Sequence, residues 1–199
     1  MNQPLVIFLN GTSSAGKTSI AKAIQKLSPL PMLHVGFDHF YFMLPPTHVM
    51  DGENANKGFQ LIKDDRGVSI QIGPMGESLT YVMRRSMKML LDQQFHLIID
   101  EVLISDEWFE DYLELFKETR VFFVGVKPPI EVAEQRELKR GDRFIGLARG
   151  LNEIVHRGKN YDLIIDSSQM SPEQSAQIIL NHIKVDALNN HLDFANTSQ

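Results

Sequence analysis

The sequence predicts an α/β fold of three layers, with helices on both faces of a five-stranded, mostly parallel sheet. Five short apolar runs alternate with longer amphipathic segments along the 199 residues, and a glycine-rich loop joins the first run to the first amphipathic segment. Strands that alternate with helices are connected by right-handed crossovers, which produce a parallel sheet. No repeat or shift in composition divides the chain, so one domain is expected over residues 1–185, followed by a flexible polar tail over residues 186–199.

Each predicted element follows from the spacing of its apolar residues. The strands are expected at Leu5–Leu9, Met32–Val35, Leu97–Ile99, Val121–Val126 and Leu163–Ile165. The helices are expected near Ser19–Leu27, Ser78–Leu91, Trp108–Phe116, Pro129–Lys139 and Pro172–Ile183. Residues 39–75 form an expected substrate insertion, irregular and rich in Gly and Pro over Pro45–Gly73, with a small hairpin at Phe59–Ile72. In an open α/β sheet such an insertion covers the crevice at the strand ends.

Composition narrows the possible partners. The net charge of -5 and the lack of a long basic run argue against binding to nucleic acid. Cys is absent, which removes disulfides, thiolate metal sites and thiol nucleophiles together. No apolar run approaches the roughly 20 residues that span a bilayer, and the first run is too short for a signal peptide. A cytoplasmic protein without a membrane partner is expected, and its oligomeric state is left open.

The loop over residues 11–18 matches the phosphate-loop pattern G-x-x-x-x-G-K-[ST] between a strand and a helix. Gly11 and Gly16 allow turns that point backbone N–H groups at an anion, Lys17 can reach the β- and γ-phosphates, and the Thr18 hydroxyl can bind Mg²⁺. ATP and Mg²⁺ are therefore the expected cofactors. The alternative is a glycine-rich turn that holds no ligand. The expected nucleotide-binding residues are Gly11, Thr12, Ser13, Ser14, Ala15, Gly16, Lys17, Thr18, Arg136 and Ser167.

Two carboxylates follow predicted strands and suggest chemistry. Asp100 ends an apolar strand of Walker B form and is the expected second metal ligand, although acidic residues also end strands for solubility. Glu101 either faces the acceptor or caps the next helix. Asp38 is the expected general base for an acceptor hydroxyl, and it also suits an N-cap of a short helix at His39–Leu44. His39 is a weaker candidate base, because a His in an aromatic run more often packs.

The segment from Leu27 to Asn56 contains no Lys or Arg, whereas a nucleoside monophosphate would need arginines there to hold its phosphate. Its aromatic residues favour an uncharged acceptor that carries a hydroxyl. Arg136, Arg140 and Arg143 form a basic cluster at helical spacing within an expected lid over residues 136–150. Closed over ATP, they would neutralise the transferring phosphoryl group, or they form a solvated face with neighbouring Glu partners. Ser167 follows the last strand, where adenine would bind or a turn would form.

These residues resemble the chloramphenicol phosphotransferases and related small ATP-dependent kinases from the N-terminus to about Ile183. The motifs that carry the resemblance are Leu9-Asn10-Gly11-Thr12-Ser13-Ser14-Ala15-Gly16-Lys17-Thr18, Gly36-Phe37-Asp38 with Met43-Leu44-Pro45, Ile98-Ile99-Asp100-Glu101-Val102, Val124-Gly125-Val126, Arg140-Gly141-Asp142-Arg143, and Tyr161-Asp162-Leu163 with Asp166-Ser167-Ser168. The resemblance implies transfer of phosphate from ATP to a primary hydroxyl, with Asp38 as base and Arg140 and Arg143 as lid arginines. The segment His39–Tyr41 is more aromatic than the family pattern, and Glu101 stands where a second Asp is familiar.

The interpretation is a phosphate-loop kinase of the nucleoside-monophosphate-kinase type that acts on a small hydroxylated molecule. Its expected catalytic residues are Asp38, Lys17, Arg140 and Arg143, and its expected metal ligands are Thr18 and Asp100. One alternative is a kinase for a nucleoside, nucleotide or nucleotide-sugar, as zeta-type toxins are. The other is a regulatory protein that binds a nucleotide without transferring phosphate.

Overall fold

A computed structural model describes the chain over residues 3–64, 67–141 and 144–196, with side chains up to Lys184. The main sheet has five strands, all parallel, in the order β2-β6-β1-β7-β8. Their bounds are β1 Leu5–Asn10, β2 Met32–Gly36, β6 His96–Glu101, β7 Arg120–Val126 and β8 Leu163–Ile165. The predicted five-stranded parallel sheet is therefore confirmed, with each strand within two residues of its expected bounds.

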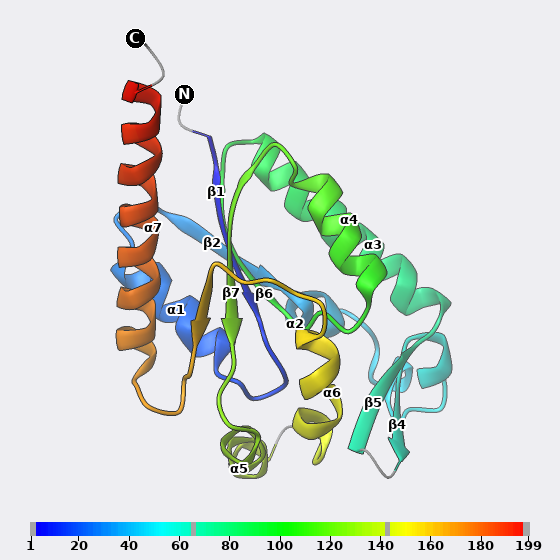
Figure 1. Ribbon diagram of the computed structural model, residues 1–199. Helices are drawn as coiled ribbons and strands as arrows, with labels where there is room; N and C mark the ends of the chain where they lie inside the picture. Colours follow the sequence, from blue (N-terminus) through cyan, green and yellow to red (C-terminus); the bar gives the residue numbers. More distant parts are fainter. Residues whose placement is uncertain (1–2, 65–66, 142–143, 197–199) are drawn as a thin grey trace.

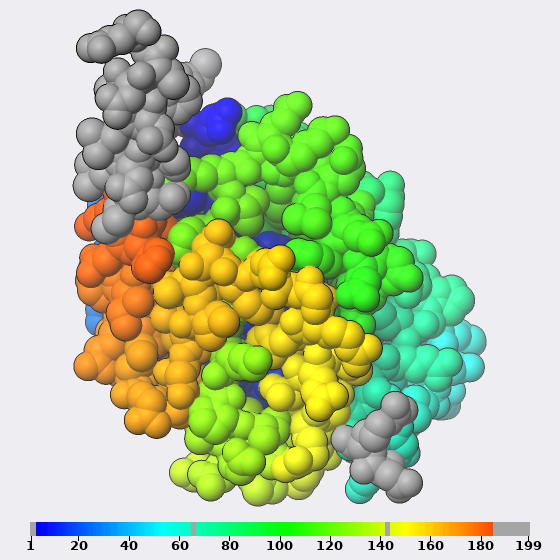
Figure 2. Space-filling view, in the orientation of Figure 1, coloured from blue at the N-terminus to red at the C-terminus, as the bar shows by residue number. Residues whose placement is uncertain are grey.

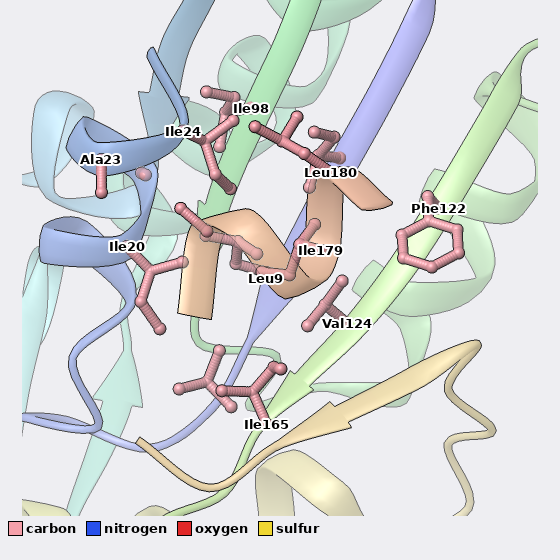
Figure 3. Packing of buried hydrophobic residues seen from close by; sticks show 14 of the residues in the cluster. Leu9, Ile20, Ala23, Ile24, Ile98, Phe122, Val124, Ile165, Ile179 and Leu180 are labelled. Carbon is pink, nitrogen blue, oxygen red and sulfur yellow. The ribbon is translucent and has the colours of Figure 1, made fainter. Parts of the chain in front are cut away.

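Helices cover both faces of this sheet, because its strands are apolar on both sides. Leu5, Ile7 and Leu9 pack with α1 (Lys17–Leu27) and α7 (Pro172–Asn196), as Figure 3 shows for Leu9. Val6 and Phe8 point the other way, into a second cluster with α3 (Pro74–Asp92) and α4 (Asp106–Leu115). Successive side chains of a strand alternate between faces, so a run that is buried throughout belongs between two helical layers.

The expected insertion contains a second, three-stranded sheet (Figure 1). Strands β4 (Phe59–Asp64) and β5 (Gly67–Ile72) pair antiparallel over the residues where the hairpin was predicted, and β3 (Val49–Met50) pairs parallel with β4. Two 3₁₀ turns, Pro46–His48 and Ala55–Lys57, occupy the rest of the insertion. A small aromatic core holds this unit against the domain, made of Phe37, Tyr41, Phe59 and Trp108.

Helix α3 begins at Pro74, four residues before its predicted start, and two other differences lie closer to the cavity-forming end of the sheet. Helix α2 spans Phe37–Tyr41 and begins two residues earlier than expected, so Asp38 lies inside its first turn and is not the N-cap. Helix α6, Leu147–His156, was not predicted at all, and its first four residues fall within the expected arginine lid over residues 136–150. It follows α5 (Ile130–Arg140) and packs against the hairpin (Figures 1 and 2).

The last helix is longer than the sequence suggested. Helix α7 passes its expected end at Ile183 and continues to Asn196, and the flexibility of residues 186–199 stays a prediction. Figure 1 shows α7 ending near the start of β1, at the opposite end of the sheet from α5, α6 and the hairpin. Within the described part of the chain, no helix combines the length and apolar character that crossing a membrane requires.

Candidate active site

A cavity of about 450 Å³ opens at the carboxyl ends of the main strands. It is bounded by the phosphate loop, α2, the end of β6, α5, α6 and the loop after β8. The predicted site residues that line it are Ser13, Ser14, Gly16, Lys17, Thr18, Asp38, Asp100, Arg136, Arg140 and Ser167. Parallel strands all end at this edge, which is why residues far apart in the sequence converge there.

Two residues of the phosphate loop have a positive φ angle. Gly16 has φ +99°, and Ser14 also lies in the left-handed region with φ +59°. The buried Lys17 donates from Nζ to the carbonyl of Thr12 at 3.0 Å, which holds its side chain over the loop. Ser14 and Gly16 therefore adopt conformations that most residues avoid, as expected for a loop built to turn its N–H groups inward.

Three of the predicted nucleotide-binding residues do not line the cavity. A Cβ on Gly11 would lie 2.4 Å from the carbonyl oxygen of Val126, so this glycine is required by the close approach of β7. The Thr12 hydroxyl donates to the carbonyl of Ala148 at 2.6 Å, and Ala15 is buried in the core beneath the loop. These three residues thus shape and support the loop without presenting a side chain to the cavity.

The predicted metal ligands lie against each other. The Thr18 hydroxyl donates to Asp100 Oδ2 at 2.6 Å, and Lys17 Nζ lies 3.9 Å from Asp100 Oδ1. His34 of β2, which the sequence reasoning did not single out, places Nε2 3.5 Å from Asp100 Oδ2. Burial alone would raise the pKa of Asp100, but His34, the charge of Lys17 and the Thr18 hydroxyl together hold that pKa below its usual value. The Asp100 carboxyl is therefore ionised at neutral pH.

Asp100 and Glu101 point to opposite faces of the sheet. Asp100 shares its face with Ile98 and α1, whereas Glu101 shares its face with Ile99 and is fully buried. Glu101 Oε1 accepts a hydrogen bond of 2.9 Å from the Tyr112 hydroxyl, and burial raises the pKa of Glu101 to about 8. Both expected roles for Glu101 are wrong, because it lies away from the cavity and Ser105 caps α4.

The first turn of α2 brings Asp38, which is half-buried, to the same cavity that the phosphate loop lines. His39, its neighbour, is exposed and is not among the lining residues. The His39 ring instead makes an edge contact with His34, with 5.0 Å between ring centroids. Of the two candidate bases, the geometry thus brings only Asp38 to the cavity.

Arg136 joins three segments rather than lying on a solvated face. It donates from Nη1 and Nη2 to the hydroxyl and carbonyl of Ser167 at 2.9 and 2.7 Å, and from Nη1 to the carbonyl of Ala15 at 3.3 Å. The Ser167 hydroxyl donates to the same Ala15 carbonyl at 2.6 Å. Arg140 lines the cavity one turn further along α5. The expected lid residue Arg143 lies outside the described residues.

The cavity has an apolar wall, but most of its residues do not come from the aromatic segment after β2 that the sequence predicted. That wall consists of Phe37, Ile70, Val102, Ile104, Leu147 and Leu151. Of the aromatic segment after β2, Phe37 reaches the cavity, whereas Tyr41 is core and Phe42 is 68% exposed. The apolar spacing of Leu147 and Leu151, one helical turn apart, was the sequence signal that could have identified α6.

Known proteins match this chain over most of its length. The family model of chloramphenicol phosphotransferase-like proteins matches residues 4–184. A Mycobacterium tuberculosis protein named "Putative O-phosphotransferase" is 34% identical over 176 residues, which cover 84% of this chain and 77% of the relative.

Solved structures of other kinases share the fold. An APS kinase from Mycobacterium tuberculosis, in complex with AMPPNP and APS, superposes with a TM-score of 0.64 at 15% identity, over 92% of this chain and 99% of that one. A gluconokinase from Sinorhizobium meliloti 1021 has a TM-score of 0.64 at 18% identity, over 97% and 99% of the two chains. At these identities the likeness is one of fold.

Proposed function

This chain belongs to the chloramphenicol phosphotransferase-like family and is a P-loop kinase, and we propose that it transfers the γ-phosphate of ATP to a hydroxyl of a small uncharged molecule. The observation that carries the proposal is that Asp38, Lys17 and Asp100 line one cavity although they come from three different elements. A base, a phosphate-binding cation and a metal ligand around one space are the parts that phosphoryl transfer needs.

The donor side of the cavity suits a triphosphate. The N-terminus of α1 and the turns at Ser14 and Gly16 offer backbone N–H groups to an anion. Ser14 lines the cavity, and its buried hydroxyl has no hydrogen-bond partner among the described residues, so it could donate to a phosphate oxygen. Lys17 and Arg140 would stabilise the charge of the transferring phosphoryl group. Arg136 would hold the phosphate loop in place through its hydrogen bond to the Ala15 carbonyl.

Thr18 and Asp100 fit Mg²⁺ by the chemistry of their donor atoms. A hydroxyl and an ionised carboxylate are hard oxygen ligands, and their oxygens lie 2.6 Å apart at the cavity. In the part of the chain that the structure describes, no group of three or more His, Cys, Asp or Glu is placed to hold a metal ion, so these two oxygens would be the protein ligands. Mg²⁺ with only two protein ligands completes its shell with water and phosphate, and when bound there it would neutralise phosphate charge.

Asp38 would act on the acceptor. As the acceptor oxygen attacks the γ-phosphorus, its O–H bond breaks and the proton passes to the Asp38 carboxylate, while the bond from phosphorus to the leaving oxygen of ADP breaks. The apolar wall supports an uncharged acceptor, because its six side chains offer no charge to pair with a phosphate or carboxylate. Chloramphenicol is the first compound to test, and hydroxylated antibiotics or metabolites of similar polarity follow.

The test is ATP consumption against a panel of hydroxylated antibiotics, nucleosides, sugars and nucleotide-sugars, with mass spectrometry of the product. The expected outcome is an uncharged compound that gains one phosphate. A charged nucleotide-sugar as the preferred substrate would refute the acceptor assignment. No ATP turnover with any compound, despite ATP binding, would favour a regulatory protein.

A pair of variants tests the base. Asp38→Asn should lower transfer about 100-fold or more while ATP binding stays within about threefold, because proton transfer by a positioned group contributes 10² to 10⁴ in rate. His39→Gln alters the neighbouring, exposed side chain and should transfer at the wild-type rate. Near-normal turnover in Asp38→Asn would remove Asp38 from this role, and a loss confined to His39→Gln would assign it to His39.

A further inference from the structure

Four hydrogen bonds from three different elements converge on the first turn of α6. Glu137 of α5 accepts from the N–H groups of Gly146 and Ala148, at 2.7 and 2.8 Å. The Thr12 hydroxyl of the phosphate loop donates to the carbonyl of Ala148 at 2.6 Å. The N–H of Val68 in β5 donates to the carbonyl of Gly146 at 3.2 Å. The phosphate loop, α5 and the β4–β5 hairpin therefore all contact this turn, Gly146–Ala148.

Glu137 is unusual among the charged residues of α5 because it is almost completely buried. Only 1% of its surface is exposed, although five of the other ten residues of α5 are charged. Its carboxylate satisfies two N–H groups at the start of α6, where a negative charge also complements the helix dipole. Glu137 adjoins Arg136 and precedes Arg140 by three residues, so the same turn of α5 holds α6 and presents arginines to the cavity.

Strand β5 of the hairpin also packs tightly against α6. A Cβ at Gly150 would lie 2.1 Å from the carbonyl oxygen of Val68, so the backbone of α6 lies directly on β5. Ile70 of β5 and Leu147 and Leu151 of α6 form part of the apolar wall from the two sides of this contact. A molecule against that wall therefore presses on the helix that Glu137 ties to α5.

We propose that Glu137 and Thr12 are positioning residues for phosphoryl transfer. Neither lines the cavity, and both hold the first turn of α6, so that the apolar wall, Arg136 and Arg140 of α5, and the phosphate loop keep one relative geometry. This inference rests on the proposed function. A misplacement of about 1 Å in a site of this kind can cost about 10²-fold in rate, which makes a buried anchor outside the cavity relevant to catalysis.

The first experiment replaces Glu137 by Gln. Glutamine keeps the shape but offers one acceptor oxygen for two N–H groups, so one contact is lost and an amide N–H₂ faces a donor. Glu134→Gln is the matched control, since Glu134 also links α5 to α6, through a surface ion pair with Arg149 at 2.6 and 2.8 Å. Three measurements use the whole chain: the dissociation constant of AMPPNP by calorimetry, the rate of MgATP hydrolysis without acceptor, and trypsin cleavage after the exposed Lys139 and Arg140 with and without AMPPNP.

Glu137→Gln should bind AMPPNP within threefold of wild type, hydrolyse MgATP at least tenfold more slowly, and lose the protection from trypsin that AMPPNP gives to the wild-type chain. Glu134→Gln should match wild type in all three. A merely structural role would lower the melting temperature without this separation between binding and turnover. A folded Glu137→Gln with wild-type hydrolysis and protection would overturn the proposal.

Thr12 provides a second test if Glu137→Gln does not fold. Thr12→Val has nearly the same shape and removes the bond to Ala148, whereas Thr12→Ser retains a hydroxyl and should restore turnover to within about threefold of wild type. The Val variant should show the same tenfold loss, and equal turnover of the Val and Ser variants would overturn the proposal. If the wild-type chain itself binds no AMPPNP, the proposed function fails and takes this inference with it.

Discussion

Replacing Asn10 tests how the end of β1 holds the site together. Asn10 is fully buried, and its Nδ2 donates to the carbonyl of Val155 in α6 at 2.6 Å and to the Tyr161 hydroxyl at 2.8 Å. Its Oδ1 accepts from the N–H of Leu103, after β6, at 3.1 Å. One side chain thus joins α6, the β6–α4 loop and the segment before β8 to the residue that precedes the phosphate loop.

The magnitude follows from the groups that Asn10→Ala leaves unpaired. Tyr161 keeps its 2.7 Å contact with His156 Nδ1, so the groups that lose a good partner are the N–H of Leu103 and the carbonyl of Val155. A buried polar group without a partner costs about 1–3 kcal/mol, so the variant should lose about 4 kcal/mol of its unfolding free energy. A domain of ordinary stability, about 5–15 kcal/mol, then stays folded but is much weakened.

The assay is urea unfolding followed by the fluorescence of Trp108, the single tryptophan, which is buried. Asn160→Ala, at an exposed asparagine in a loop, should stay within about 0.5 kcal/mol of wild type. Asn10→Asp should be at least as damaging as Asn10→Ala, because it places a carboxylate against the Val155 carbonyl. A loss below about 1 kcal/mol in Asn10→Ala, with an unchanged denaturant slope, would refute the reasoning from unpaired groups.

Two further predictions concern α6. Burial, together with nearby lysines, lowers the pKa of His156 to about 4, so its ring should stay neutral at pH 5.5 while the unfolded chain binds a proton near pH 6.5. Its contribution to stability is complete above about pH 6.5 and is lost as the pH falls toward 4; an NMR midpoint above pH 6 would contradict this. Gly150→Ala places a Cβ against the Val68 carbonyl and should cost about 2 kcal/mol in urea unfolding, whereas Asn152→Ala on the same helix should cost much less.

The fold could be predicted because its signals are local. Each main strand is an apolar run, and a glycine stands on either side of the hairpin over residues 59–72. Helix α6 was missed because its start lies beside a glycine-flanked basic segment, so charge dominated the interpretation over the apolar spacing. Helix α2 was predicted two residues too late because Asp38 suits an N-cap. In the structure the N-cap is Gly36, which has an extended backbone.

The candidate site was predictable in part for the same reason. Lys17, Thr18 and Asp100 stand in patterns whose spacing implies their position at the strand ends. Nothing in the sequence separates Glu137 from Glu134 in a charged helix, yet one is buried under α6 and the other forms a surface ion pair. That difference depends on where α6 lies, which no local pattern of α5 contains.

By itself, the sequence determined the parallel sheet, the phosphate loop, and the positions of Asp100 near the end of β6 and Asp38 two residues after β2. These follow from the spacing of apolar residues and the positions of glycines, which act within a few residues of the chain. Only the tertiary structure decided which of Asp100 and Glu101 faces the cavity, and that Leu147 and Leu151 form part of its apolar wall. Neighbouring residues on a strand must point to opposite faces, but the layers packed on each face decide which side becomes the site and which becomes core.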